Sequence, residues 1–216
     1  MKVLLIGATS ATGKFVLQHL IKDERIDEIV VFVRKITGIN STKLKEVVVD
    51  FDRLADYKEW MQGNVAISCL GTTLKQAGSK EKQWLVDHDY QLEFARLTKE
   101  NGVSHFILLS AIGVSETSSF FYNRMRGSLE NAVKKLQFPR LDLLRPSILI
   151  RPNSDRLGEK VSEKILKLLN TVGILKSYQP IHVQDLAKVM QDLIFVSDSD
   201  VFTHEVKDIL KMLQKK

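Results

Sequence analysis

Short apolar runs alternate with amphipathic stretches along most of this chain. Several runs are rich in Val, Ile and Leu and lack apolar–polar alternation, which is typical of strands buried on both faces of a parallel sheet. The predicted strands are Lys2–Ile6, Glu28–Val33, Lys45–Val49, Val65–Cys69, Ser104–Leu109 and Leu141–Leu144, with a seventh near Ser177–Ile181.

The stretches between these strands carry apolar residues at helical spacing. One stripe, which ends at Gly102, consists of Val86, Tyr90, Phe94 and Leu97. Another ends before Phe138-Pro139 and consists of Phe121, Met125, Leu129, Ala132 and Leu136. Further helices are expected from Val183 to Phe195 and from Glu205 to Leu213. This order predicts an α/β fold with a doubly wound, mainly parallel sheet of six or seven strands and helices on both faces.

The chain shows no internal repeat, low-complexity segment or Pro/Gly-rich linker. Its 216 residues are therefore expected to form one domain over 1–216, which is long enough for a large core. The region 151–177 departs from the alternation of strands and helices. We expect it to form a cap on the substrate side, over the carboxyl end of the sheet.

The turn after the first predicted strand is the strongest functional signal. It reads Gly7-Ala8-Thr9-Ser10-Ala11-Thr12-Gly13 and leads into a helix. Backbone N–H groups and a helix N-terminus there suit a pyrophosphate, with Gly7 for the sharp turn and Gly13 for close helix–strand packing. Ser10 stands where the usual pattern has a middle glycine, and its hydroxyl and those of Thr9 and Thr12 can donate to phosphate. Ala11 completes the predicted cradle; a plain tight turn is the alternative.

Two cations follow the second strand, Arg34 and Lys35, and Arg34 lies 21 positions after Gly13. An acid there would bind the ribose 2′-hydroxyl of NAD, whereas cations suit the 2′-phosphate of NADP. A solvated basic strand end is the alternative. Three further segments follow predicted strands. Asp50 and Phe51 are expected at the adenine, and Pro146 and Ile148 in the pocket wall. The segment expected along the ribose and nicotinamide consists of Cys69, Leu70, Gly71, Thr72 and Thr73.

Ser110 follows the fifth strand, and the next helix carries Tyr122 and Arg126 one turn apart, with Glu130 on the same face. A tyrosine near a cation can act as a proton donor in carbonyl reduction, because the positive charge favours the phenolate. Ser110 could hydrogen-bond the reacting oxygen. For Tyr122 and Arg126, packing at the core edge and an ordinary surface cation are the alternatives.

Composition changes this picture little. The net charge is +6, but the lysines lie among acids, so an anionic cofactor is favoured over nucleic acid as the partner. The single cysteine, Cys69, excludes an internal disulfide and fits a reducing, cytoplasmic setting. No apolar run approaches the roughly 20 residues of a membrane helix, the first apolar run is too short for a signal peptide, and no histidine has metal-ligand spacing.

Taken together, these motifs make the chain resemble atypical short-chain dehydrogenase/reductases, in the Tat-interacting-protein-like group related to NmrA-like proteins. The resemblance spans nearly the whole chain. It rests on Gly7–Gly13, Arg34, Val48-Val49-Asp50-Phe51, Cys69–Thr73, Val86–Tyr90, Leu108–Ser110, Phe120–Tyr122 and Leu144–Pro146. It implies a Rossmann sheet that binds NADP(H), and a catalytic serine with a Tyr-x-x-x-Lys pair.

Carried over to this chain, the serine is Ser110 and the tyrosine is Tyr122. The lysine position holds Arg126, and a second serine found in related sequences is Ala111 here. The resemblance implies an NADPH-dependent reductase of a small carbonyl or enone. The alternative is a nucleotide-sensing or partner-binding protein that keeps the cradle without efficient chemistry. Monomer and homodimer are both compatible with the resemblance.

Overall fold

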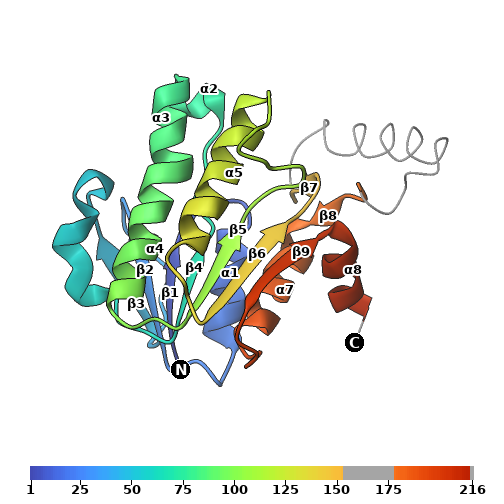
Figure 1. The fold of residues 1–216 in the computed structure, drawn as a ribbon. Helices are drawn as coiled ribbons and strands as arrows, with labels where there is room; N and C mark the ends of the chain where they lie inside the picture. Colours follow the sequence, from blue (N-terminus) through green and yellow to red (C-terminus); the bar gives the residue numbers. More distant parts are fainter. Residues whose placement is uncertain (153–177, 215–216) are drawn as a thin grey trace.

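The computed structural model describes residues 1–152 and 178–214. In this part of the chain, seven parallel strands form one sheet in the order β3-β2-β1-β4-β5-β6-β9 (Figure 1). The strands are β1 (Lys2–Ile6), β2 (Glu28–Val33), β3 (Leu44–Val48), β4 (Val65–Ser68), β5 (His105–Leu109), β6 (Arg140–Arg145) and β9 (Val201–Glu205). A separate two-stranded sheet pairs β7 (Leu149–Ile150) with β8 (Ile181–His182).

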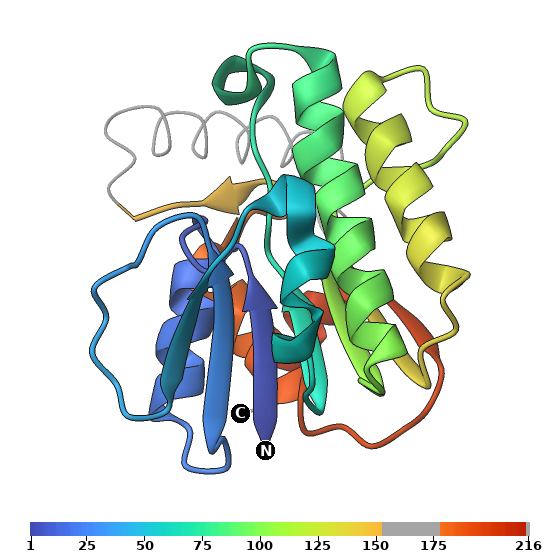
Figure 2. The ribbon, with the colours of Figure 1, turned by 90° about the vertical axis from the view of Figure 1, so that its left-hand side faces the viewer.

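Helices cover both faces of the large sheet (Figures 1 and 2). One face carries α1 (Gly13–Lys22), α7 (Val183–Leu193) and α8 (Val206–Gln214). The other carries η1 (Phe51–Trp60), the π-helical turn η2 (Leu85–Asp89), α4 (Tyr90–Glu100) and α5 (Phe121–Lys134). The short helices α2 (Leu74–Ala77) and α3 (Lys80–Trp84) precede η2.

The sheet divides the core in two because successive side chains of a strand point to opposite faces. Val3 and Leu5 of β1 pack with α1 and α7, whereas Leu4 and Ile6 pack with α4 and α5. All four are fully buried. Without polar alternation in β1, the two helical layers can each cover an apolar face, as the sequence pattern predicts.

The predicted strands match the structure except at the last position. Strands β1 and β2 have the predicted bounds, and β3 to β6 differ by one residue at an end or at both ends. The seventh strand of the large sheet is Val201–Glu205 rather than the segment near Ser177–Ile181, which instead ends in β8. The prediction failed because β9 is a half-exposed edge strand with polar residues. Most of the predicted cap, 153–177, lies outside the described residues.

A buried carboxylate ties β9 to the sheet. Asp142 of β6 is fully buried and contacts His105 Nε2 of β5 and His204 Nε2 of β9, each at 2.6 Å. Arg140 donates Nε and Nη2 to the same carboxylate at 2.7 and 3.0 Å. Burial acts to raise the pKa of Asp142, but the hydrogen bonds from both histidines and Arg140 outweigh it and hold the pKa well below its usual value.

We therefore predict that Asp142→Asn lowers the free energy of unfolding by about 3 kcal/mol, because it leaves Arg140 buried without its partner. Urea titration measures the change. The exposed Asp56→Asn is the matched control and should change stability by less than about 0.5 kcal/mol. A similar loss in both variants would contradict this role for Asp142.

The same cluster gives a pH dependence. Because the folded-state pKa of Asp142 is lowered, the carboxylate contributes to the stability of the fold above its unfolded pKa of about 4. This contribution is lost as pH falls through the folded-state pKa. Native protein should therefore lose stability more steeply below pH 4 than Asp142→Asn does. Parallel acid unfolding curves would contradict the lowered pKa.

Candidate functional site

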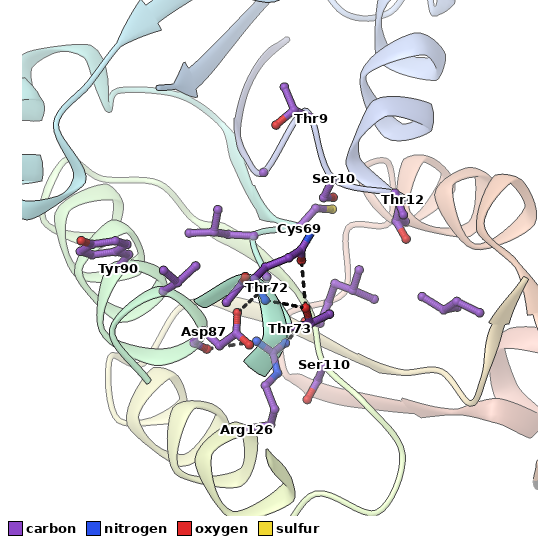
Figure 3. A pocket seen from close by; sticks show the side chains of 18 of the residues that line it. Thr9, Ser10, Thr12, Cys69, Thr72, Thr73, Asp87, Tyr90, Ser110 and Arg126 are labelled. Carbon is purple, nitrogen blue, oxygen red and sulfur yellow. Dashed lines mark hydrogen bonds between the residues drawn. The ribbon is translucent and has the colours of Figure 1, made fainter. Parts of the chain in front are cut away.

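A cavity of about 560 Å³ opens at the carboxyl ends of the central strands. Its volume is that of a small-molecule or cofactor site. It is lined by Gly7, Thr9, Ser10, Ala11, Thr12, Arg34, Phe51, Cys69, Leu70, Gly71, Thr72, Thr73, Gln76, Val86, Asp87, Tyr90, Leu109, Ser110, Tyr122, Arg126, Leu149 and Arg151. Figure 3 shows side chains from the β1–α1 turn, the segment after β4, η2 and α5 meeting around this space.

The β1–α1 turn is closed by backbone contacts that only glycine permits. Gly7 has a φ of +77°, and a Cβ there would lie 2.3 Å from the carbonyl carbon of Cys69. A Cβ on Gly13 would lie 2.0 Å from the Gly7 oxygen. Ser10 takes the middle position by accepting a hydrogen bond from Gly13 N at 3.0 Å through its hydroxyl oxygen. The Ser10 proton thus remains available to a phosphate oxygen.

Most predicted cofactor residues line the cavity, but five do not. Gly13 lies beneath the turn, and Lys35 is exposed at the end of β2. Asp50 caps η1 by accepting a hydrogen bond from Asp52 N. Pro146 and Ile148, which were predicted to form the pocket wall, do not line the cavity: Pro146 is buried, and Ile148 is half-exposed beside β7. Leu149 and Arg151 line the cavity instead.

The expected adenine end contains Arg34, Phe51 and Tyr90. The rings of Phe51 and Tyr90 pack with their centroids 5.4 Å apart, and the Tyr90 hydroxyl donates to Asp52. Burial, followed by the nearby carboxylates, raises the pKa of Tyr90 to about 12, so this phenol stays protonated. Arg34 has no carboxylate partner in the described part of the chain and lies on the cavity wall.

Cys69 contributes backbone rather than a reactive thiol to this wall. Its side chain is buried with Sγ 4.0 Å from Met190 Sδ. Burial raises the pKa of the thiol to about 12, so it stays protonated and unreactive at neutral pH.

Asp87 of the π-helical turn η2 organises the segment after β4. It is almost fully buried, and its carboxylate accepts from Thr72 N at 2.6 Å and from Gln83 Nε2 at 3.3 Å. Burial raises the pKa of Asp87, against the opposing charge of Arg126. Val86–Tyr90 contributed to the resemblance, but no place at the site was predicted for its residues. A polar residue between the apolar positions of that helix was the available signal.

Two further residues, Gln76 and Leu149, line the cavity although they belong to no motif of the sequence. Leu109 also lines it, and it lies in the Leu108–Ser110 segment that contributed to the resemblance.

Arg126 is buried, with 4% of its surface exposed, and not a surface cation. It donates Nη1 to the Asp87 carbonyl at 3.2 Å and Nη2 to the Leu109 carbonyl, so it joins α5 to η2 and β5. Its Nε is the one buried side-chain polar atom of the described residues without a hydrogen-bond partner. Arg126 does not pair with Glu130, which instead binds Arg145.

Tyr122 lies on the same cavity wall and is 42% exposed. In residues 1–152 and 178–214, no protein group hydrogen-bonds its hydroxyl. Ser110 is nearly buried at the end of β5, beside Arg126 (Figure 3). The structure therefore brings the three predicted catalytic residues, Ser110, Tyr122 and Arg126, to one cavity with the glycine turn.

Comparison with known proteins shows the family of this chain. The NAD(P)H-binding family matches residues 7–146, which include both the turn and the α5 residues. The chain belongs to the NAD(P)H-binding family. It is 35% identical to Protein HTATIP2 of Rattus norvegicus over 167 residues, which cover 75% of this chain and 69% of the relative. It is 30% identical to the mitochondrial Protein FMP52 of Meyerozyma guilliermondii over 192 residues, with 87% and 83% covered.

Within the NAD(P)H-binding family, the chain is one of the atypical short-chain dehydrogenase/reductases. MoeE5 in complex with UDP-glucose and NAD aligns with a TM-score of 0.69 at 14% identity, covering 100% of this chain and 81% of that one. A UDP-glucose 4-epimerase from Thermotoga maritima has the same score at 15% identity, with 100% and 82% covered. These structures show the shared Rossmann-like fold.

Two features are absent from the part of the chain that the structure describes. No helix among the described residues is long and apolar enough to cross a membrane. These residues also contain no group of three His, Cys, Asp or Glu side chains that could hold a metal ion.

We predict different outcomes for alanine at two glycines of this family site. Gly13→Ala should lower stability, because its Cβ would collide with the Gly7 backbone. Gly71→Ala should fold normally, because its Cβ would meet only Asp87 Oδ1 at 3.7 Å, yet its methyl group would narrow the cavity and weaken NAD(P)H binding. Thermal melting and cofactor titration separate the effects; a Gly71→Ala variant that binds as native would contradict this placement.

Proposed function

We propose that the protein binds NADP(H) in preference to NAD(H) and uses it to reduce a small carbonyl or enone. The observation that carries this proposal is the joint placement of the glycine turn, Arg34 and Tyr122 on one cavity wall. The glycine turn offers a phosphate cradle. Within residues 1–152 and 178–214, Arg34 has no carboxylate partner and the Tyr122 hydroxyl has no hydrogen-bond partner.

The residues present fit the dinucleotide. The Gly7–Gly13 turn would hold the pyrophosphate through backbone N–H groups and the Ser10 hydroxyl. Arg34 would hold the 2′-phosphate, because its guanidinium offers a bidentate donor pair and binds no carboxylate in the part of the chain that the structure describes. Phe51 and Tyr90 would flank the adenine.

When bound, the cofactor supplies the hydride. The chain supplies the proton: the Tyr122 hydroxyl, free of protein partners in the described residues, would donate to the substrate oxygen. The positive charge of Arg126, one turn along α5, would stabilise the phenolate that remains. Arg126 is buried, so water screens its charge less than that of a surface cation.

One observation favours a second candidate, a nucleotide-binding protein without turnover. Arg126 already donates to the carbonyls of Asp87 and Leu109, which accounts for its charge and place without any catalytic step. In this case the cofactor would act as a signal that stabilises one conformation of the cavity for a partner.

The cofactor preference is tested at two adjacent cations. Arg34→Ala should weaken NADP(H) binding by roughly 10- to 100-fold, as expected for lost hydrogen bonds to a charged group, and leave NAD(H) binding nearly unchanged. Lys35→Ala is the matched control and should change either affinity little, because Lys35 does not line the cavity. Isothermal titration with both cofactors measures this. Equal native affinities for the two cofactors would contradict the proposal.

The chemistry is tested with Tyr122→Phe. NADPH oxidation against a panel of aldehydes, ketones and enones should fall by roughly 10²- to 10⁴-fold, because general acid catalysis is lost. The Kd for NADPH should stay within about twofold of the native value. If native protein turns over no member of the panel while it binds NADPH, the second candidate is favoured; equal turnover by the variant would exclude Tyr122 as the acid.

A further inference from the structure

The hydroxyl of Ser110 is committed to a buried carboxylate. Ser110 directly follows β5, where its N–H donates to the Leu144 carbonyl at 2.7 Å. Its Oγ is hydrogen-bonded to Glu130 Oε1 on α5. Glu130 is only 1% exposed, so water cannot replace this contact. The orientation of the Ser110 hydroxyl is thus set by α5.

The charge of Glu130 is fixed by Arg145. Arg145 donates Nε to Glu130 Oε1 at 3.0 Å and Nη2 to Oε2 at 2.5 Å, a bidentate pair. Its Nη1 binds Glu205 Oε1 at 2.9 Å. These contacts, led by the hydrogen bond to Glu130, raise the pKa of Arg145 further above its already high value. A carboxylate held by a guanidinium on both oxygens is ionised and can only accept.

This arrangement determines which way the proton points. An ionised Glu130 has no proton to give, so Ser110 must be the donor in the bond between them. A serine hydroxyl has a single proton. Toward the cavity, Ser110 can therefore offer lone pairs but no proton.

We propose that Glu130 makes Ser110 a hydrogen-bond acceptor, and that the ligand atom bound at Ser110 is a donor, either a hydroxyl or an amide N–H. This inference rests on the proposed function, because it concerns the cofactor and substrate of that cavity. It changes the role expected for Ser110: polarisation of a carbonyl oxygen would require it to donate. The proton and positive charge offered to such an oxygen come instead from Tyr122 and Arg126.

A carbonyl oxygen bound next to Ser110 would face the lone pairs of Ser110 Oγ and would find no proton to accept. To donate to it, Ser110 would have to turn its proton away from Glu130, which leaves the buried carboxylate with one donor fewer. Glu130 is thus a positioning residue that acts through Ser110. Two groups could supply the donor: the carboxamide of the nicotinamide, or a hydroxyl of the substrate in its alcohol form.

The first experiment tests the cofactor as the source. The 3-acetylpyridine analogue of NADP⁺ replaces the amide with a methyl ketone and so lacks the N–H donor. If the carboxamide binds Ser110, native protein should bind NADP⁺ roughly three- to tenfold more tightly than the analogue, as expected for one hydrogen bond. Ser110→Ala should bind the two equally.

The second experiment tests a substrate hydroxyl as the source. Cyclohexanol is titrated into the NADPH complex and cyclohexanone into the NADP⁺ complex, neither of which can react. If a hydroxyl binds Ser110, Ser110→Ala should weaken cyclohexanol binding roughly three- to tenfold and leave cyclohexanone binding unchanged.

Glu130→Gln tests the positioning role itself. The glutamine amide can donate to Ser110 Oγ, which frees the serine proton for the cavity, so the preference for a donor ligand should vanish or reverse. Glu205→Gln is the matched control: it removes a carboxylate from Arg145 but touches neither Ser110 nor Glu130, and it should keep the preference. Thermal melting of both variants checks the fold, and Ser110→Ala keeps the test decisive if Glu130→Gln fails to fold.

A native protein that binds NADP⁺ but discriminates neither the analogue nor the alcohol through Ser110 would overturn the inference and leave the proposed function standing. Tighter binding of the ketone ligands through Ser110 would overturn it as well. Absence of any NADP(H) binding would contradict both.

Discussion

The turn after β1 leaves no space for side chains at two points, and the site depends on this. A Cβ on Gly7 would collide with the Cys69 backbone, and one on Gly13 with the Gly7 carbonyl. These contacts draw together the ends of β1 and β4 and the start of α1. The strand order runs outward from β1 in one direction and from β4 in the other, so the contact lies at the switch point where doubly wound sheets bind ligands. Arg34, Asp87 and Tyr122 are placed around it.

The parts of this arrangement that are local in sequence could be predicted. The apolar runs gave the bounds of β1 and β2, because strands buried on both faces leave an unbroken pattern. The Gly7–Gly13 turn was recognisable because the phosphate cradle is one continuous segment. Tyr122 and Arg126 were found together because a helix brings residues four apart to one face.

The parts of the arrangement that depend on contacts between residues far apart in the sequence could not be predicted. Strand β9 has few apolar residues because it lies at the sheet edge, and His204 joins it to Asp142 of β6, a partner far away in the sequence. Lys35 was grouped with Arg34, but only Arg34 lines the cavity, and the order of two cations in the bend after β2 does not show which side chain faces it. The commitment of Ser110 to Glu130 was equally hidden, since spacing along α5 does not show which group a side chain binds.

Together these features support our central proposal, in which a dinucleotide would lie across the β1–β4 switch point, with its pyrophosphate on the Gly7–Gly13 turn and its nicotinamide near Tyr122. The most direct test is a crystal structure of the protein with NADP⁺. We expect the pyrophosphate to be hydrogen-bonded to backbone N–H groups of the turn, the 2′-phosphate to contact Arg34, and the nicotinamide ring to lie between Ser110 and Tyr122. A dinucleotide bound outside this cavity, or one with its nicotinamide at the Arg34 end, would contradict the account.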